Sequence, residues 1–438
     1  MAKEPKSVEI RGYQVGFGDC FLVSFIYSDT EKKHLLIDFG TTGLPRSRKP
    51  STHMPVIARS IEKACGGELT AVIATHRHAD HISGFATDNK TGKSGDIIRG
   101  LNPKVVLQPW TEDPQAAKNA KKATKDSNRS AKSFVASLTS MHQVAQSVVE
   151  LTKTKPAWMG ASLHRELQFL GMDNIANESA VKNLIAMGEA KGATAVWAHH
   201  GSKSGLERHL PGVKIHVLGP PNLEQTEKIK KMRAKDPDQF WHLLAGFNGR
   251  SSLQSVRGGK RGKKNGTLPP DARWFRSRLD RMRGQQLLEI VRSLDDQMNN
   301  TSLILLFEVF GKKLLFPGDA QIENWSWALQ DSPDHKDTLK LLSEVDVYKV
   351  GHHGSLNATP KKMLWGELKK RGAAGPGRLL TILSTMPGKH PGGASGGGEV
   401  PRGKLLDALE ADTDLASTDA LKKSAKFENA AWFNTVEI

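Results

Sequence analysis

The sequence predicts an α/β protein, and three observations support this prediction. Short apolar runs typical of strands alternate with amphipathic runs typical of helices. The strand-like runs gather toward both ends of the chain, on either side of a polar and basic middle. The 438 residues are enough for one elaborate domain with a substantial core. We therefore expect one domain over 1–438, with helical and basic insertions in its middle.

The amino-terminal part predicts several strands and a helix in close succession. The run "VEIRGYQVGFGDCFLVSFIY" reads as two strands around a glycine turn, and "KHLLIDFG" as a third strand that ends at Asp38. "VIARSIEKAC" has helical periodicity, "LTAVIATH" is typical of a buried strand, and "HISGFATD" resembles a helix start.

The middle of the chain is less regular, and strands return toward the end. From Asn89 to about Lys191 the sequence is polar, lysine-rich and partly helical. After the strand pattern "KIHVLGPPN" comes a predicted helix interrupted near Pro237, and then a Gly/Lys/Arg segment at 257–266 that we expect to be a mobile linker. The runs "TSLILLFEVFGKKLLFPGD", "VDVYKVGHHGS" and "RLLTILST" again predict strands.

The strongest chemical signal is "THRHADH", which directly follows the apolar strand "AVIA" and holds His76, His78, Asp80 and His81. Residues two apart on an extended segment point the same way, so His76 and His78 can bind one cation. The turn that follows can direct Asp80 and His81 toward another. Imidazole and carboxylate are the ligands that zinc prefers, so this cluster predicts a metal site.

"THRHADH" resembles the signature of the metallo-β-lactamase superfamily. Further features come in that family's order: "LLIDFG" with Asp38, "NNTSLILLF" with Ser302, "FPGDA" with Asp319, and "GHHGS". Together with "VGFGDCFLV" they resemble the ComEC-like metallo-hydrolase branch. The likeness covers about 10–110 and 213–395 and implies an αββα sandwich, two sheets face to face with helices outside. The segments at about 111–212 and 223–290 depart from the family pattern as insertions.

The resemblance also implies roles for individual residues. His76 and His78 would bind the first metal, Asp80 and His81 the second, and Asp319 would bridge both, with zinc the expected ion and manganese or iron the alternatives. Asp38 would orient ligands without binding metal. His352 is the favoured last histidine ligand, and its neighbour His353 is either the true ligand or a substrate contact. Asp80, His353 and Asp38 are accordingly the expected catalytic residues.

The tetrapeptide "HHGS" occurs twice, at 199–202 and at 352–355. The first copy falls where the superfamily usually supplies a third histidine to the first metal, so His199 and His200 are candidate ligands. The alternative is a pair of exposed histidines at the end of a helix or strand. His390, in "MPGKHPGG", could hold a phosphate or protonate a leaving group, or have no role in the site.

The charge favours an anionic partner. Sixty-three Lys and Arg against 46 Asp and Glu give a net charge of +17. Between Arg257 and Arg283 ten basic and two acidic residues give +8, and a second basic run spans 118–132. Either segment could instead be a solvated loop. Within the first run, Arg273, Trp274, Arg276 and Arg278 are candidate nucleic-acid contacts, unless the aromatic rings pack into the core.

The predicted function is a zinc-dependent metallo-hydrolase, a phosphodiesterase or nuclease that acts on nucleic acid or nucleotides through a metal-activated hydroxide. The alternatives are a lactonase or esterase on a small metabolite, and a nucleic-acid-binding module with a structural metal site. The start "MAKEPKSVEI" lacks an apolar signal region, no apolar stretch is long enough to span a membrane, and only two cysteines are present. We expect a cytoplasmic protein without membrane contact.

Overall fold

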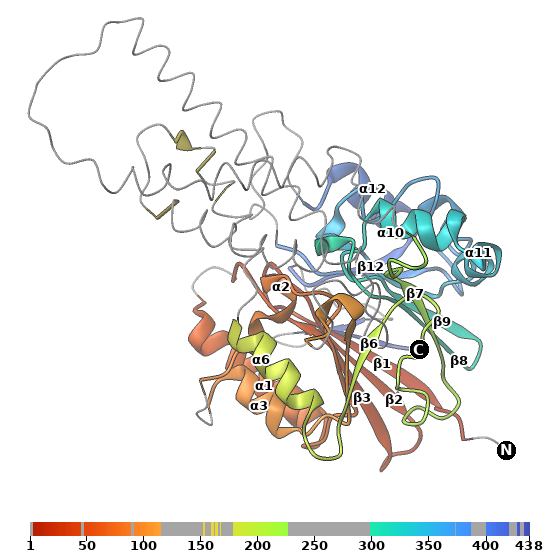
Figure 1. Cartoon of the computed structure of the whole chain (residues 1–438). Coiled ribbons are helices and arrows are strands. Elements are labelled where there is room, and N and C mark those ends of the chain that lie inside the picture. The colour runs from red at the N-terminus through yellow and green to blue at the C-terminus, as the bar shows by residue number, and fades with distance from the viewer. Residues whose placement is uncertain are drawn as a thin grey trace, which may run out of the picture.

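The computed structural model describes most of the chain outside its middle, as mixed α/β structure with two β-sheets and helices (Figure 1). The described residues are 3–44, 48–88, 92–114, 152–153, 159–161, 163–164, 167, 178–226, 298–372, 374–386, 400–419, 427–429 and 433–438.

The first sheet has eight strands in the order β13-β14-β1-β2-β3-β4-β5-β6. Strands β13 to β3 pair in antiparallel fashion, whereas β3, β4, β5 and β6 are parallel. The carboxyl ends of these four parallel strands therefore meet at one edge. The strands are β1 (Ser7–Tyr13), β2 (Cys20–Ile26), β3 (Lys32–Phe39), β4 (Ala71–Ile73), β5 (Val105–Pro109), β6 (Thr194–Ala198), β13 (Phe427–Asn429) and β14 (Phe433–Glu437).

The second sheet has six strands in the order β12-β11-β10-β9-β8-β7. Strands β9 to β12 are parallel, and β8 pairs antiparallel with both β9 and β7. Its parallel strands also bring their carboxyl ends to one edge. The strands are β7 (Lys214–Gly219), β8 (Ile304–Val309), β9 (Lys312–Phe316), β10 (Val347–Lys349), β11 (Leu380–Leu383) and β12 (Asp414–Ser417).

Helices pack against the face of each sheet that is turned away from the other sheet, and Figure 1 shows the two groups on opposite sides. Helices α1 (Pro50–Ala64), α3 (Ser94–Gly100) and α6 (Glu178–Gly188) cover the first sheet, and α10 (Ile322–Ser326), α11 (His335–Ser343) and α12 (Gly403–Asp412) the second. The shorter elements are α2 (Ala79–Ile82), η1 (Ser83–Phe85), η2 (Trp110–Glu112), η5 (Trp327–Asp331), η6 (His352–Gly354) and η7 (Trp365–Glu367).

The central core lies between the two sheets. Alternate residues of a strand point to opposite faces, so Phe21 and Val23 of β2 belong to the central cluster while Leu22 packs toward the helices. Phe21 contacts Phe316 of β9 with ring centroids 6.1 Å apart in an edge-on arrangement. Aromatic pairs of this kind add to the stabilisation from buried area. The two sheets are thus held face to face by a shared apolar layer.

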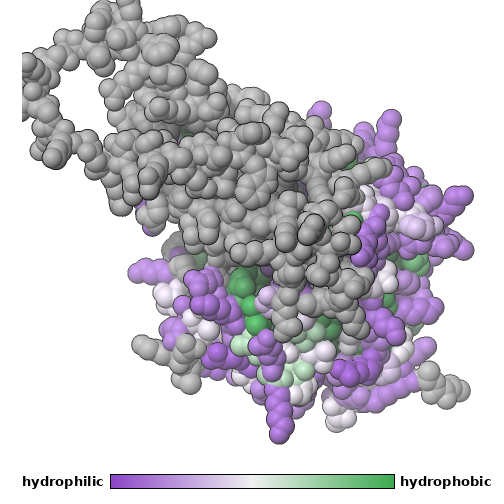
Figure 2. Space-filling view, viewed as in Figure 1, coloured by the Kyte–Doolittle hydropathy of each residue, from purple (hydrophilic) through white to green (hydrophobic). Residues whose placement is uncertain are grey.

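The surface of the described residues is mainly polar. Figure 2 shows hydrophilic side chains over most of the coloured surface on this side of the molecule. Large apolar side chains that are exposed are scattered: Val56, Phe310 and Leu356. Among the described residues, none of the helices combines the length and the apolar character that crossing a membrane requires.

The expected strands and the α1 helix are confirmed, but the segment 111–212 is not wholly an insertion. It contains α6, which packs against the first sheet, and β6, which pairs with β5 over Val105–Pro109 and Thr194–Ala198. Both elements are short and follow a long polar region, so periodicity alone did not reveal them. The predicted linker at 257–266 lies outside the described residues, as do most of the expected insertion at 223–290 and the interrupted helix within it.

Candidate metal centre

The candidate site residues follow the carboxyl ends of parallel strands in both sheets. Asp38 stands near the end of β3, and the "THRHADH" segment follows β4. Asp319 follows β9, and His352 and His353 follow β10. Because these strand ends lie at one edge of each sheet and the sheets are packed face to face, residues more than 200 positions apart come into contact.

The first group of side chains comes from the first sheet alone. His76, His78 and Asp80 are buried, and they offer ligand atoms that all lie within 4.8 Å of one another. The Nε2 atom of His76 lies 3.0 Å from Nδ1 of His78. Two imidazole nitrogens at this distance are typical of a pair that can bind one cation.

The second group joins the two sheets. Asp80, His81, Asp319 and His353 are buried and again offer ligand atoms within 4.8 Å of one another. The Nε2 atom of His353 lies 2.8 Å from Oδ2 of Asp80, and Nε2 of His81 lies 3.0 Å from Oδ2 of Asp319. Asp80 belongs to both groups, so the two candidate positions are adjacent.

Hydrogen bonds outside the two groups fix the ligand side chains. Asp38 accepts hydrogen bonds at 2.7 Å from both the backbone N–H and the hydroxyl of Thr75, and its Oδ2 lies 2.8 Å from Nδ1 of His81. Nδ1 of His353 donates to the carbonyl oxygen of Ser384 at 2.9 Å. A partner on one ring nitrogen sets the tautomer and directs the other nitrogen inward, as in many metal sites.

The backbone is strained at three of these residues. Asp38, His352 and His353 have φ values of 54°, 45° and 49°. Residues other than glycine seldom adopt this left-handed region, and such strain is concentrated at functional sites.

Burial and the four neighbouring carboxylates determine the protonation of the cluster. Burial lowers the pKa of His76 well below its ordinary value, with help from His81 and His78. Burial also opposes a charge on His81, but Asp319, Asp80, Asp38 and Asp19 together raise its pKa well above the ordinary value. The pKa of Asp319 is well below its ordinary value, because His81 and its other cationic neighbours outweigh the effect of burial.

Within the part of the chain that the structure describes, several buried ligand atoms have no hydrogen-bond partner. They include Oδ1 of Asp80, Nε2 of His81 and Oδ2 of Asp319. An unpaired buried polar atom is costly, and coordination to a cation would satisfy all of these atoms at once. The donor set of imidazoles and carboxylates therefore fits a metal ion.

The structure brings His353, and not His352, into the metal-binding groups. His353 is fully buried and points at Asp80 and Asp319, whereas the His352 side chain is 16% exposed and its Nε2 lies 4.0 Å from Oδ2 of Asp319. The left-handed turn at these two residues sends their rings in different directions. Of the two neighbouring candidates for the last histidine ligand, the geometry therefore favours His353.

The first "HHGS" copy does not join the cluster. Nδ1 of His199 bonds to the carbonyl oxygen of His200. The ring nitrogens of His200 bond to the carbonyl oxygen of Leu218 and to Oδ1 of Asp334, both at 2.8 Å. His200 thus connects the end of β6 to β7 and to the start of α11. His390 and the candidate nucleic-acid contacts Arg273, Trp274, Arg276 and Arg278 lie outside the described residues.

Two buried charged residues of the site were missed by sequence reasoning. Asp19, just before β2, lies beside His353, and Lys349, the last residue of β10, forms an ion pair with Asp19. Asp19 was passed over because the surrounding "GFGDC" was interpreted only as a turn. Lys349 did carry a signal, since a lysine inside the apolar strand "VDVYKV" directly before "GHHGS" is unusual.

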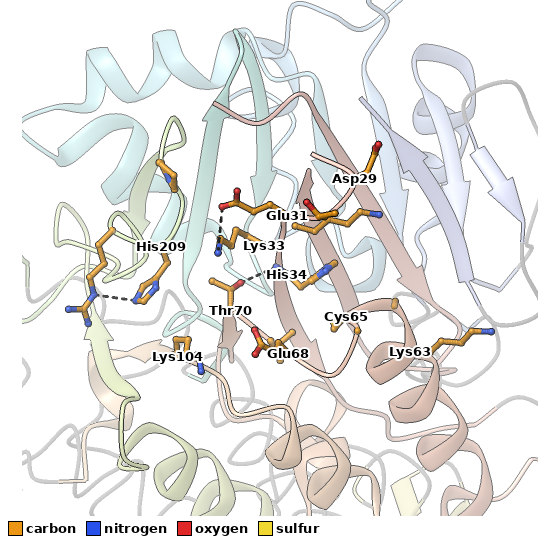
Figure 3. Close-up of a pocket in the computed structure, with 17 residues that line it drawn as sticks. Asp29, Glu31, Lys33, His34, Lys63, Cys65, Glu68, Thr70, Lys104 and His209 are labelled. Atoms are coloured by element: carbon orange, nitrogen blue, oxygen red, sulfur yellow. Dashed lines mark hydrogen bonds and ion pairs between the residues drawn. The ribbon is translucent and has the colours of Figure 1, made fainter. Parts of the chain in front are cut away.

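A large pocket lies away from this cluster, and Figure 3 shows its lining. Its volume is about 660 Å³, and its walls include His34 at the start of β3, Thr70 before β4 and Lys104 before β5. These positions are at the amino ends of the parallel strands, whereas the cluster follows their carboxyl ends. The pocket is therefore separate from the candidate metal centre.

Comparison with models of known protein families finds no match, and comparison with curated proteins finds none that is similar to this chain.

Proposed function

We propose that this protein is a metal-dependent hydrolase with the αββα architecture of the metallo-β-lactamase superfamily. The observation that carries the proposal is the buried cluster of histidines and aspartates whose ligand atoms approach one another closely, several of them without a hydrogen-bond partner among the described residues. Its position at the strand ends of two packed sheets, with helices on the outer faces, supports the architecture.

The chain offers ligands for two divalent ions, with zinc as the expected metal and manganese or iron as the alternatives. His76 and His78 would hold the first ion, and His81, His353 and Asp80 the second. Asp80 belongs to both groups; by the resemblance to the metallo-β-lactamase pattern Asp319 would also be shared, because one carboxylate between two dications offsets their repulsion. Six side chains for two ions leave room for further ligands, whereas a structural zinc site is closed by four protein ligands.

Bound ions of this kind would supply an activated water near neutral pH and stabilise the negative charge that develops on the substrate. The protein's own residues would hold the reactants in place. Asp38 orients His81, and the Ser384 carbonyl orients His353. His352, which is partly exposed beside the cluster, would contact a substrate oxygen.

The proposed substrate class is a phosphodiester in nucleic acid or nucleotides. The net charge of +17 favours an anionic substrate over a neutral lactone or ester. The ComEC-like pattern of motifs in the sequence points the same way.

The test combines metal analysis with a hydrolysis panel. Purified protein is expected to carry close to two divalent ions per chain and to hydrolyse bis-p-nitrophenyl phosphate, DNA or RNA. His76→Ala should lose both activity and metal, whereas His199→Ala should keep both. Protein without bound zinc, manganese or iron after metal-replete purification would refute the proposal. Hydrolysis of lactones alone would be consistent with the proposed metal centre but would contradict the proposed phosphodiester substrate.

A further inference from the structure

The side chain of Lys349 is an unusual feature of this site. It is 2% exposed, and its ammonium group lies among three acceptors: Asp19, with which it pairs, Oδ1 of Asp319 at 3.5 Å, and the carbonyl oxygen of Gly318 at 3.2 Å. The ammonium group donates a hydrogen bond to the Gly318 carbonyl and forms ion pairs with the two carboxylates. The pKa of Lys349 is raised, because these carboxylates outweigh the opposing effect of burial.

Burying a charged lysine side chain costs free energy of desolvation, and apolar residues often stabilise a protein interior as well or better. The neighbouring positions of β10 and the strands beside it are filled by apolar side chains such as Val347 and Leu315. Packing alone would therefore be satisfied by methionine at position 349. The charge at this position calls for another explanation.

The contacts of Asp319 offer an explanation for the charge at position 349. Its Oδ1 atom faces the Lys349 ammonium group and accepts the backbone N–H of His352 at 3.1 Å. Its Oδ2 atom faces His81 and has no hydrogen-bond partner. Lys349 thus helps to fix one carboxylate oxygen and leaves the other directed into the metal-binding group.

Asp19 extends the same link to the first sheet. The backbone N–H of Asp19 donates to the carbonyl oxygen of Asp80 at 2.9 Å. The carbonyl oxygen of Asp19 in turn accepts the backbone N–H of Gly40 at 3.0 Å. The path from Asp80 through Asp19 and Lys349 to Asp319 therefore joins the two halves of the cluster.

We propose that Lys349 is a positioning residue, an internal cation that orients Asp319 and ties it through Asp19 to the Asp80 turn, and so sets the metal affinity of the centre. This inference rests on the proposed metal centre. It assigns a role to Lys349 and to its partner Asp19, whose carboxylate also lies within 4.8 Å of ligand atoms of Asp38 and His81.

The experiment measures Zn²⁺ binding by titration calorimetry on protein shown to be folded by circular dichroism. Lys349→Met alone leaves Asp19 buried without its partner and can unfold the chain, so the informative variant is Lys349→Met/Asp19→Asn, which removes both charges. We expect it to fold and to bind Zn²⁺ about 10- to 100-fold more weakly, as for other residues that orient ligands. The control is Lys313→Met, because Lys313 on the adjacent β9 is also buried but pairs with Glu344 away from the cluster.

The possible outcomes separate the two proposals. If the wild-type protein binds no Zn²⁺, the proposed metal centre fails. If the wild type binds but the double variant binds with the same affinity, the positioning role of Lys349 is wrong and the centre stands. An equal loss in Lys313→Met would mean that the effect is a general one of removing a buried charge, and would also overturn the inference.

Discussion

At the scale of single residues, the hydrogen bonds of the ring nitrogens distinguish His353 from His352 as a metal ligand. His353 has Nδ1 fixed by the Ser384 carbonyl and Nε2 directed at Asp80, and its ring lies 4.4 Å from that of Phe17. His352 has no such support on its ring: its Nδ1 is buried without a hydrogen-bond partner. Burial and the neighbouring His353 lower the pKa of His352 to about 4, so it is a neutral side chain at physiological pH.

The two neighbours should therefore respond differently to substitution. His353→Ala is expected to lose about one metal ion per chain and nearly all hydrolytic activity, because it opens the group shared with Asp80 and Asp319. His352→Ala should retain its metal and lose activity only in part. Elemental analysis of both variants gives the answer, and loss of the ion in His352→Ala alone would reverse the assignment.

A second prediction at this scale concerns His34, far from the metal centre. Burial, with a contribution from Lys32, lowers its pKa from 6.5 to about 4. Between these two pH values the unfolded chain binds more protons at this residue than the folded chain does. The stability from His34 is therefore complete above about pH 6.5 and is lost as pH falls toward 4, by up to about 3 kcal/mol.

The measurement is urea unfolding of the wild type and of His34→Gln at several pH values between 7 and 4. The variant should show a shallower loss of stability on acidification, since glutamine can accept the Ser24 hydroxyl hydrogen bond without titrating. Parallel curves for the two proteins would show that His34 does not carry this pH dependence.

At the scale of elements, the site depends on close packing of strand ends against the Asp80 turn. Gly40, directly after β3, lies so near this turn that an added Cβ would stand 2.3 Å from the carbonyl carbon of Asp80 and 2.4 Å from the backbone nitrogen of His81. Real Cβ atoms do not approach backbone this closely, so only glycine fits here. The end of β3 and the metal-binding turn are thus in direct backbone contact.

Gly40→Ala is accordingly expected to displace the Asp80–His81 turn, to destabilise the fold by about 1–3 kcal/mol and to weaken Zn²⁺ binding. Gly100→Ala is the matched control, because Gly100 ends α3 with open space around it and alanine is the better helix former by up to about 1 kcal/mol. Denaturant unfolding and metal titration of both variants test the contrast. Unchanged metal binding in a folded Gly40→Ala protein would contradict it.

At the scale of the whole molecule, the strong positive charge is not explained by the described fold. The candidate metal centre needs anionic ligands, and much of the basic excess falls in the run from Arg257 to Arg283, outside the described residues. A basic segment that contacts phosphates would make binding of long substrates depend on salt, because each contact releases counterions.

Replacing Arg273, Arg276 and Arg278 by Gln should weaken cleavage of long DNA or RNA and lower the salt slope of binding by up to about 3. Hydrolysis of bis-p-nitrophenyl phosphate should be unchanged, since so small a substrate cannot contact the segment and the metal centre together. Equal losses of activity on both substrates would mean that the segment supports the fold and does not contact the substrate. No loss on either would leave the net charge without a role in catalysis.

The sequence by itself determined much of the local structure and the chemistry of the ligands. Strands such as β2 and β8 follow from their apolar runs, and the cluster of His76, His78, Asp80 and His81 follows from spacing, because residues this close in the chain stay close in any fold. Short elements such as β6 were not foreseen, since five residues next to a polar region give little periodicity.

Only the tertiary structure decided the choices that depend on direction and on contacts between distant segments. Of the two neighbours, the structure directs His353 into the cluster, because the turn after β10 and the Ser384 carbonyl set its ring orientation. The first "HHGS" copy lies outside the cluster, where His200 forms a hydrogen bond with Asp334. Asp19 and Lys349 entered it because the two sheets pack face to face and bring together charges 330 residues apart, a proximity that no local pattern in the chain encodes.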